Sequence, residues 1–410
     1  MKLLQLNTTV NSGSTGRITE DIGQVMLANG HESYIAYGRG NRPSQSKLIK
    51  VGGQLDVLWH GLKTALFDRH GFGSKRATQD LVRAIRKLKP DVIGMHNIHG
   101  YYLNIEVLFR FFAEVETPVV WTLHDCWSFT GHCTFYSSID CQRWQTACYE
   151  CPKKDKYPRS YWLDQSNRNF KEKRQLFTSA NNLQLVTPSH WLARQLADSY
   201  LQHVPVRVIH NGVDTHAFHP DISEEVLKGT VDTSKKMILG VASTWDERKG
   251  LSEFIQLSKR LTDEYQIVLV GLSAKQIKQL PAAIRGLERT ESLEELAALY
   301  AHASVYCNPT FQDNFPNTNI EALSCGTPVV AYQTGGCPEA VDENTGKIVP
   351  VGDVSALWRA IQEVAEGDRE QWRQACRDRA LRLFDKKDRY QDYLSLYQRL
   401  LSTQSTAQNT

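Results

Sequence analysis

The sequence lacks any long apolar run. No segment approaches the roughly 18 consecutive apolar residues that a membrane-spanning helix needs. The opening letters, MKLLQL, form an apolar stretch too short for a signal peptide and are more typical of a first β-strand. These features predict a cytoplasmic protein.

An excess of charge of one sign is also absent. The 410 residues include 48 basic and 45 acidic side chains, which gives a formal net charge of +3. This balance provides no general attraction for a polyanion, so nucleic-acid binding is not expected. The share of apolar residues is 41% and that of charged residues is 23%, as in ordinary globular proteins, and the length suggests two or three domains.

The nine cysteines show no disulfide framework, because five of them cluster within residues 126–151. The last four have the spacing C-x7-C-x6-C-x2-C, and the closing CYEC pair can bring two thiolates to one tetrahedral metal. A reducing cytoplasm disfavours disulfides. We therefore predict a structural zinc ion bound by Cys133, Cys141, Cys148 and Cys151, and free buried thiols are the alternative. Four protein ligands would leave zinc no open position for catalysis.

Strands and helices alternate along most of the chain, which predicts an α/β fold with parallel sheets. The first set has expected strands at residues 2–6, 34–37, 91–96, 118–123, 183–187 and 206–209, with helices that include residues 18–27 and 81–88. The second set has expected strands at residues 237–242, 266–271, 305–307 and 329–332, with helices that include residues 291–300 and 320–324.

Residues 308–336, NPTFQDNFPNTNIEALSCGTPVVAYQTGG, predict a loop, a helix and a strand that follow the strand at residues 305–307. Such a unit aims free helix amides at the carboxyl edge of a parallel sheet, where phosphates bind. Asp313 could hold sugar hydroxyls, and Glu321 could accept two hydrogen bonds from a ribose diol. The amides at the helix start could receive a diphosphate. Asn317, Thr318 and Asn319 are therefore candidate binding residues.

The pair Asp313 and Glu321, with seven residues between them, resembles the acid-x7-Glu signature of retaining glycosyltransferases. With the NFP, EALSCGTPVV and TGG elements, the chain resembles family 4 of the GT-B glycosyltransferases, particularly the branch of bacterial exopolysaccharide and colanic acid synthesis. The family usually has Glu where this chain has Asp313. The resemblance implies two Rossmann-like domains facing an interdomain cleft. It also implies retaining transfer of a sugar from a nucleotide-diphosphate sugar to a hydroxyl of a glycan or lipid-linked acceptor, with no cofactor required.

The resemblance extends to the first half at three places. His124, in the TLHD stretch, resembles the strand-end histidine that bonds a hydroxyl of the transferred sugar, and a core imidazole held by Asp125 is the alternative. Gly16 closes an expected loop at residues 7–16 that would face donor phosphates or the acceptor, unless it is simply a turn. The NGVD turn at residues 211–214 resembles the end of the family's first domain. From its position at a strand end, His99 is an expected acceptor contact.

Lys249, in the Lys-Gly pair before the helix that starts at residue 251, resembles the family's phosphate-binding lysine. The family usually has an arginine six positions earlier, and this chain has Ser243 there. Arg248 could take over that role or point to solvent.

We expect an acceptor-side domain at residues 1–215, with the cysteine-rich insertion at about 126–152, and a nucleotide-sugar domain at residues 216–386. Residues 387–402 are expected to form a helix that packs back on the first domain, and residues 403–410 a disordered tail.

Basic residues outnumber acidic ones by eight to three in residues 152–174, and four aromatic residues lie among them. This segment could rest on an anionic membrane at the inner face or meet a diphosphate-linked lipid, although a solvated helix face is also typical of such charge. Two functional alternatives remain: a nucleotide-sugar epimerase of the same fold and a non-catalytic protein that binds sugar nucleotides. The donor sugar, its base and the acceptor are not encoded in a readable motif.

Overall fold

The computed structural model describes the backbone of residues 1–408 and the side chains of residues 1–404. Contacts divide the chain into two compact units. Unit 1 contains Met1–His210 and the chain from Tyr390 onward, and unit 2 contains Asn211–Arg389. Each unit is built on one sheet whose strand pairs are all parallel in the described residues. The predicted α/β fold with two parallel sheets is therefore confirmed.

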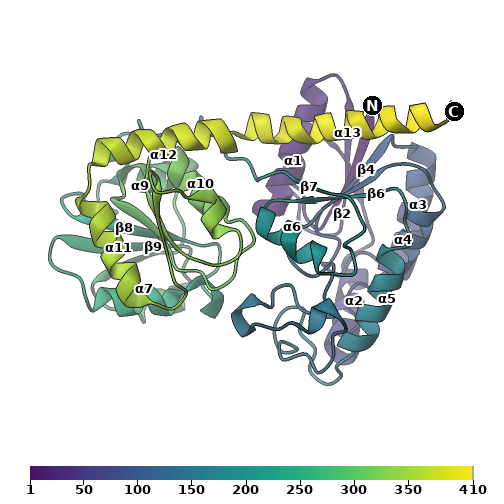
Figure 1. Cartoon of the computed structure of the whole chain (residues 1–410), viewed down its shortest axis with the longest axis horizontal. Coiled ribbons are helices and arrows are strands. Elements are labelled where there is room, and N and C mark those ends of the chain that lie inside the picture. The colour runs from purple at the N-terminus through teal and green to yellow at the C-terminus, as the bar shows by residue number, and fades with distance from the viewer. Residues whose placement is uncertain (409–410) are drawn as a thin grey trace. The chain divides into compact units, whose positions relative to one another are not determined.

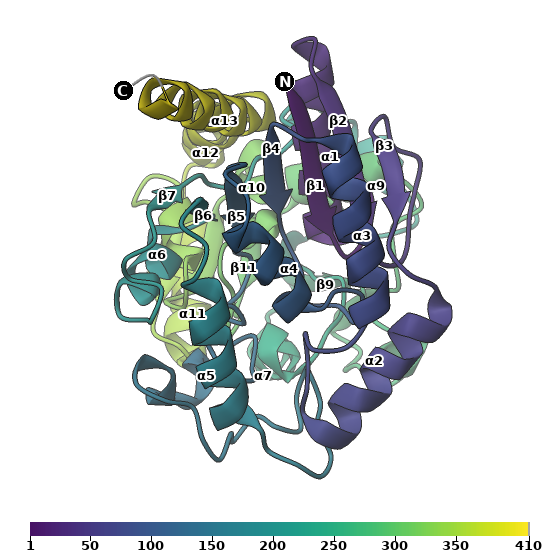
Figure 2. The same cartoon turned by 90° about the vertical axis from the view of Figure 1, so that its right-hand side faces the viewer.

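Unit 1 has a sheet with the strand order β3-β2-β1-β4-β5-β6-β7 (Figure 2). Its strands are β1 (Lys2–Asn7), β2 (Glu32–Tyr37), β3 (Lys47–Lys50), β4 (Val92–Met95), β5 (Val119–Thr122), β6 (Leu183–Thr187) and β7 (Val206–Val208). Its helices are α1 (Gly13–Ala28), α2 (Gln54–Phe67), α3 (Lys75–Leu88), α4 (Ile105–Ala113), α5 (Ser166–Phe177) and α6 (His190–Ala197), together with most of α13 (Lys386–Gln408).

Successive side chains of the strands in unit 1 point to opposite faces of the sheet, and the apolar ones form a hydrophobic core on each face. Leu4 and Leu6 of β1 belong to a cluster with residues of α3, α4, α5 and α6. Leu3, on the opposite face of β1, belongs to a cluster with residues of α1 and α13. The predicted helix that returns to the first unit is thus present as the C-terminal part of α13.

Unit 2 has a sheet with the strand order β10-β9-β8-β11-β12-β13, with helices around it (Figure 1). Its strands are β8 (Lys236–Val241), β9 (Tyr265–Val270), β10 (Ile284–Leu287), β11 (Val305–Asn308), β12 (Val329–Tyr332) and β13 (Gly346–Val349). Its helices are α7 (Leu251–Ser258), α8 (Ala274–Ile277), α9 (Leu293–His302), α10 (Asn317–Ser324), α11 (Val354–Glu366) and α12 (Arg369–Phe384).

Short 3-10 helices complete both units: η1 (Ser137–Ile139) and η2 (Arg143–Gln145) in unit 1, and η3 (Glu224–Leu227), η4 (Glu247–Lys249) and η5 (Cys337–Ala340) in unit 2. The unit 2 sheet again has two cores. Leu239 of β8 lies in a cluster with residues of α9, α10 and α12, whereas Ile238 lies in one with residues of α7 and α11.

The structure differs from the expected elements at two helix ends. The sequence predicts a loop through Gly16, but α1 already begins at Gly13, so Gly16 lies in the first turn of the helix. The sequence predicts a disordered tail after residue 402, but α13 continues to Gln408, and residues 409–410 lie outside the described part. None of the described helices is long and apolar enough to cross a bilayer.

Candidate active site

The chain of unit 2 changes direction across its sheet between β8 and β11. From β8 it proceeds outward to β9 and β10, then returns to place β11 on the other side of β8. Ligands of open parallel sheets bind at the carboxyl ends of two neighbouring strands whose following connections leave in opposite directions. In unit 2 the loops that follow β8 and β11 touch there, because the amide of Phe311 donates a hydrogen bond to the carbonyl oxygen of Arg248 at 2.8 Å.

Two predicted catalytic residues meet at this point. Lys249 Nζ donates to Asp313 Oδ2 at 2.5 Å, and the two side chains are 21% and 17% exposed. They are therefore shielded from most solvent but still reachable. Arg248 is oriented differently, since its guanidinium donates to the carbonyl oxygen of Gln312 at 3.1 Å. Lys249 is thus paired with Asp313, and Arg248 Nε lies 3.7 Å from Asp246 Oδ2.

Helix α10 carries the other predicted residues of unit 2. Its N-cap residue is Pro316, whose side chain makes no capping hydrogen bond, and the amide of Asn319 donates to the carbonyl oxygen of Pro316 at 3.1 Å. Asn317 and Thr318 at its start are half-buried. Asn319 is fully buried and accepts a hydrogen bond from Asn308 Nδ2 at 2.7 Å, which makes it part of the support behind the helix start.

Two buried tyrosines hold the polar face of α10. Tyr300 Oη donates to Glu321 Oε2 at 3.0 Å, and burial together with the negative charge of Glu321 raises the pKa of Tyr300 well above its usual value, so the phenol keeps its proton. Tyr306 is hydrogen-bonded to Thr318. Burial chiefly raises the pKa of Tyr306, and the charges of Glu321 and Asp313 add to the effect, so both carboxylates act on this phenol.

Glycines allow the two loops of unit 2 to approach the neighbouring backbone. Gly250, with φ +76°, lies so close to Pro309 that a Cβ atom would come within 2.2 Å of the Pro309 carbonyl oxygen. Gly335, with φ +54°, would bring a Cβ atom within 1.7 Å of the Asp313 carbonyl oxygen. The Lys249 and Asp313 positions thus depend on glycine next to them.

In unit 1, the carboxyl ends of β1, β4 and β5 gather a chain of polar side chains. His96 Nε2 lies 3.2 Å from Gln5 Oε1, and His96 Nδ1 lies 3.1 Å from His124 Nε2. Because the amide oxygen of Gln5 can only accept, His96 donates through Nε2 and accepts from His124 through Nδ1. His124 Nδ1 is therefore an acceptor, provided that the ring is neutral.

Burial lowers the pKa of His124 to about 4, and the opposing attraction of Asp125 does not reverse the effect. Burial likewise lowers the pKa of His96 well below its usual value. Both rings are neutral near pH 7. This arrangement departs from the alternative of an imidazole held by Asp125, because that carboxylate is hydrogen-bonded to His99.

His99 Nε2 donates to Asp125 Oδ2 at 2.8 Å, and the Tyr157 hydroxyl lies 3.4 Å from His99 Nδ1. Although burial opposes ionisation, the charge and hydrogen bond of His99 hold the pKa of Asp125 below its usual value. His99 and His124 are thus on adjoining strand ends of one polar cluster. Gly16 lies in α1, where a Cβ atom would come within 2.8 Å of Thr9 Oγ1.

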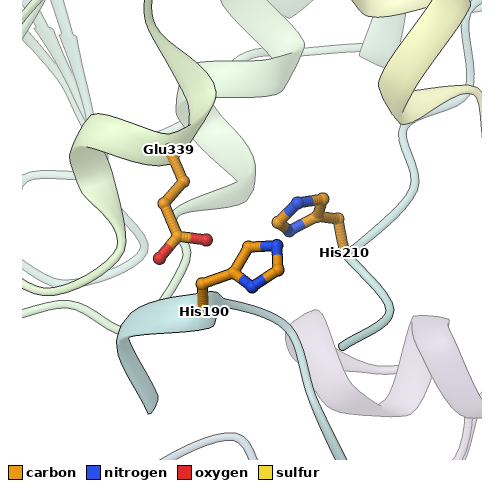
Figure 3. Close-up of side chains that lie close together, drawn as sticks. All are labelled: His190, His210 and Glu339. Atoms are coloured by element: carbon orange, nitrogen blue, oxygen red, sulfur yellow. The ribbon is translucent and has the colours of Figure 1, made fainter. Parts of the chain in front are cut away.

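Several residues of these two sites carry no sequence signal for their role. Tyr300 and Tyr306 look like ordinary core aromatics, and Gln5 is one polar residue inside an apolar strand, which is the only hint it offers. A second histidine pair, His190 and His210, follows β6 and β7, with ring centroids 5.7 Å apart at a steep angle (Figure 3). His210 Nδ1 lies 2.8 Å from the carbonyl oxygen of Pro188.

Two family models match the chain. The model described as Glycosyltransferase Family 4 matches residues 15–217, and the model described as Glycosyl transferases group 1 matches residues 235–367. Both describe transferases, which favours transfer over the epimerase and the non-catalytic alternatives.

Similar relatives include a protein of Escherichia coli (strain K12) that carries the provisional name colanic acid biosynthesis glycosyl transferase WcaC. It is 27% identical over 378 residues, which span 87% of this chain and 89% of the relative. The lipopolysaccharide core biosynthesis mannosyltransferase LpcC of Rhizobium leguminosarum bv. viciae is 29% identical over 209 residues, which span 45% of this chain and 59% of the relative.

Solved structures show the same fold. Sucrose-phosphate synthase from Thermosynechococcus elongatus has a TM-score of 0.72 at 17% identity and covers 98% of this chain and 99% of its own. Anabaena HepE, solved in complex with UDP-glucose, has a TM-score of 0.63 at 15% identity and covers 99% of this chain and 100% of its own. The fold class is therefore that of the GT-B glycosyltransferases, and the chain is a glycosyltransferase that belongs to family 4.

Proposed function

We propose that unit 2 binds a nucleotide-diphosphate sugar, that unit 1 binds the acceptor, and that the sugar is transferred with retention of its anomeric configuration. The observation that carries the proposal is the Lys249–Asp313 pair in the loops that follow the neighbouring strands β8 and β11, where the chain changes direction across the sheet. When a ligand enters, the cation and the carboxylate of this pair can each contact a different part of it. The ammonium can contact a diphosphate and the carboxylate can contact sugar hydroxyls.

The developing charge is on the leaving diphosphate, so the groups that stabilise it accelerate the reaction. Lys249 supplies a positive charge, and the start of α10 supplies the positive end of a helix dipole. The acceptor oxygen bonds to the anomeric carbon as the bond from that carbon to the phosphate oxygen breaks. The acceptor proton passes to the departing phosphate oxygen on the same face. We propose that these steps require no cofactor beyond the protein and the two substrates.

Glu321 is proposed to accept hydrogen bonds from the nucleotide ribose, with Tyr300 holding one of its oxygens. His124 is proposed to accept a hydrogen bond from a hydroxyl of the transferred sugar through Nδ1, because its Nε2–H is bonded to His96. HepE of the same fold was solved with UDP-glucose, which makes uridine diphosphate sugars the first donors to try.

Donor binding tests the proposal. Lys249→Ala removes a charged hydrogen bond worth about 2 kcal/mol, so the Kd of the variant for the donor should be roughly 30-fold higher than that of the wild-type protein. A panel of nucleotide diphosphates and their sugars is screened by thermal shift, since a bound ligand raises the melting temperature. The best ligand is then titrated against Lys249→Ala, Glu321→Gln and the control Lys259→Ala, an exposed lysine of unit 2. Equal affinities in all three variants would refute the roles of Lys249 and Glu321.

The acceptor is proposed to be a lipid-linked saccharide on an anionic membrane, because α2 exposes an apolar face. Leu55, Leu58, Trp59 and Leu62 follow helical spacing and are exposed, and Phe67 at the helix end is exposed as well, whereas His60 and Thr64 are the buried residues of this helix. An apolar stripe turned outward on a peripheral helix is typical of helices that lie in a membrane interface. Figure 2 shows α2 at the outer edge of unit 1.

The basic segment predicted from the sequence adjoins this helix. The amide of Tyr161 donates to the carbonyl oxygen of Ala65 in α2 at 2.9 Å, and the next residue, Trp162, is 74% exposed. Exposed cations of the same region can meet anionic lipid headgroups: Lys63, Lys156, Arg159, Arg168, Lys171 and Arg174. Lys173 is excluded from this set, because it is buried and donates to the carbonyl oxygens of Trp127 and Thr130.

Vesicle sedimentation tests the membrane surface. The wild-type chain should sediment with vesicles that contain phosphatidylglycerol and much less with pure phosphatidylcholine, and salt should weaken the binding. The double variant Trp59→Ser, Trp162→Ser should lose most of this binding. Leu381→Ser, which changes an exposed apolar residue of α12, should not. Equal sedimentation of the double variant and the wild type would overturn the membrane proposal.

A further inference from the structure

Five side chains with metal-ligating atoms surround one small cavity in the cysteine-rich segment of unit 1. The cavity has a volume of about 20 Å³, which is enough for one water-sized occupant, and its lining includes His132, Cys133, Cys141, Cys148 and Cys151. This segment contains only the short helices η1 and η2, so it has little regular backbone hydrogen bonding to stabilise it.

His132 carries the most informative atom of the cavity. Its side chain is fully buried, and its Nε2 has no hydrogen-bond partner among the described residues. A buried imidazole nitrogen without a partner is costly, so such an atom calls for an explanation. Its other nitrogen, Nδ1, lies 2.5 Å from Asp68 Oδ1. Metal-bound histidines almost always donate their second ring N–H to a carboxylate in this way.

Asp68 is itself fixed. Its Oδ2 accepts a hydrogen bond from the amide of Gln165 at 2.8 Å, and its carbonyl oxygen accepts one from Asn169 Nδ2 at 2.6 Å. Asp68 follows the last residue of α2, whereas Asn169 belongs to α5. The orientation of His132 is thus set by a carboxylate that is bound to a second element of the unit.

The cysteines make contacts that are compatible with the same occupant. The Cys133 and Cys151 thiols are hydrogen-bonded to each other. Cys148 Sγ accepts a hydrogen bond from the amide of Gly131 at 3.2 Å, a contact suited to a metal-bound thiolate. In the described part of the chain, no three ligand atoms drawn from these five side chains lie within 4.8 Å of one another, so binding would require side-chain movement toward the cavity.

We propose that Cys133, Cys148, Cys151 and His132 bind one structural zinc ion, with Asp68 as the positioning residue of His132. Three soft thiolates and one imidazole form a common tetrahedral zinc set. This set differs from the four cysteines predicted from the sequence, because the unsatisfied nitrogen of His132 replaces Cys141. The two CYEC cysteines, Cys148 and Cys151, remain ligands in both sets.

Metal analysis of the full chain tests the site. Protein purified anaerobically after growth with zinc should contain about one zinc ion per chain by elemental mass spectrometry. Cys148→Ser and His132→Gln should reduce this content several-fold. Cys141→Ser and Cys126→Ala should retain it, since Cys126 is a buried cysteine that does not line the cavity. Zinc lost from Cys141→Ser but kept by His132→Gln would overturn the assignment of His132.

A second measurement does not depend on the variants folding. Cobalt-exchanged wild-type protein should show thiolate-to-cobalt charge transfer and the strong visible bands of a tetrahedral site. Adding a chelator should lower the melting temperature of the wild type, because the metal holds this segment together. Wild-type protein without zinc, or a mass two hydrogens lower that indicates a disulfide, would overturn the proposal.

Discussion

At the residue scale, the protonation of His124 decides what unit 1 can offer a sugar hydroxyl. The ring sits in a chain that runs from Gln5 through His96, and each member fixes the proton of the next. A neutral His124 accepts through Nδ1, whereas a protonated one carries a proton on Nδ1, cannot accept there and places a charge in a buried site. Acid should therefore disturb the fold and the proposed contact at once.

The pH dependence has a definite sign. Burial places the folded pKa of His124 at about 4, below the unfolded value of 6.5. Between these two values the unfolded chain binds a proton that the folded chain does not, so unfolding becomes easier as the pH falls. Above pH 6.5 this residue should contribute no pH dependence. His96, whose pKa burial lowers in the same direction, should add to the effect.

Urea unfolding at pH 7 and at pH 4.5 measures this change, with hydrogen exchange assigning the transition to unit 1. We expect His124→Gln to lose less free energy of unfolding than the wild type between these two pH values. An identical loss in both proteins would contradict the neutral state of His124.

Residue types and motifs predicted much of the candidate site but not its pairing. Lys249, Asp313 and Glu321 follow from short motifs, whose spacing survives in a linear sequence. That Lys249 bonds Asp313 depends on two loops 64 residues apart meeting at one sheet edge. That Tyr300 bonds Glu321 depends on α9 packing beside α10, and a buried tyrosine has the same sequence signature with or without such a partner.

At the scale of the element, the loop after β12 supports the loop after β11. Gly335, with positive φ, approaches the Asp313 carbonyl oxygen so closely that a methyl group cannot fit without movement. Gly335→Ala should therefore cost at least about 2 kcal/mol in free energy of unfolding, from the left-handed conformation and the overlap together. It should also weaken donor binding, because Asp313 must shift.

Gly352→Ala is the matched control for this change. Gly352 also has positive φ, +80°, but nothing lies within 4 Å of the place where its Cβ atom would be. We expect a loss of about 1 kcal/mol from conformation alone, with unchanged donor affinity. Chemical denaturation and donor titration of both variants measure the difference. Equal effects of the two variants on donor affinity would contradict the support of Asp313 by Gly335.

Element ends were harder to predict than element types. Ser, Gly and Thr at residues 12–16 suggest a loop, yet α1 starts at Gly13 because its buried face, including Gly16 and Ile18, packs in the unit. The sequence predicts that residues 357–383 are largely helical without marking a break, whereas α11 ends at Glu366 and α12 begins at Arg369, with Asp368 accepting from the first amides of α12. In both cases packing and capping decide what local preference leaves open.

At the scale of the whole molecule, unit 1 is completed only by the last helix of the chain. The residues before His210 form the sheet and most of its helices, but one face of that sheet is covered by α1 and by the chain from Tyr390 onward. Unit 1 is therefore made of two segments that are far apart in sequence. Its stability must depend on a helix that follows all of unit 2 in the sequence.

A chain that ends at Arg389 should lose the stability of unit 1 while unit 2 remains folded. Tyr390, Tyr393, Leu394, Leu396 and Tyr397 are each at most 2% exposed, and Thr122 Oγ1 donates to Tyr393 Oη at 3.3 Å. At about 2 kcal/mol for each buried side chain, removing them costs about 10 kcal/mol, which is comparable to the whole stability of a domain.

Hydrogen exchange followed by mass spectrometry of peptides separates the two units in this experiment. Peptides from the sheet of unit 1 should exchange rapidly in the truncated chain, whereas peptides from β8 and β11 should keep wild-type protection. A chain that ends at Thr403 is the control, because it retains every buried residue of α13 named above and should behave like the wild type. Protection of β1 and β4 that survives truncation at Arg389 would show that unit 1 is stable without its C-terminal helix. The cluster of Leu3, Val92 and Val120 would then have to be covered by α1 alone, which contradicts the two-segment construction of this core.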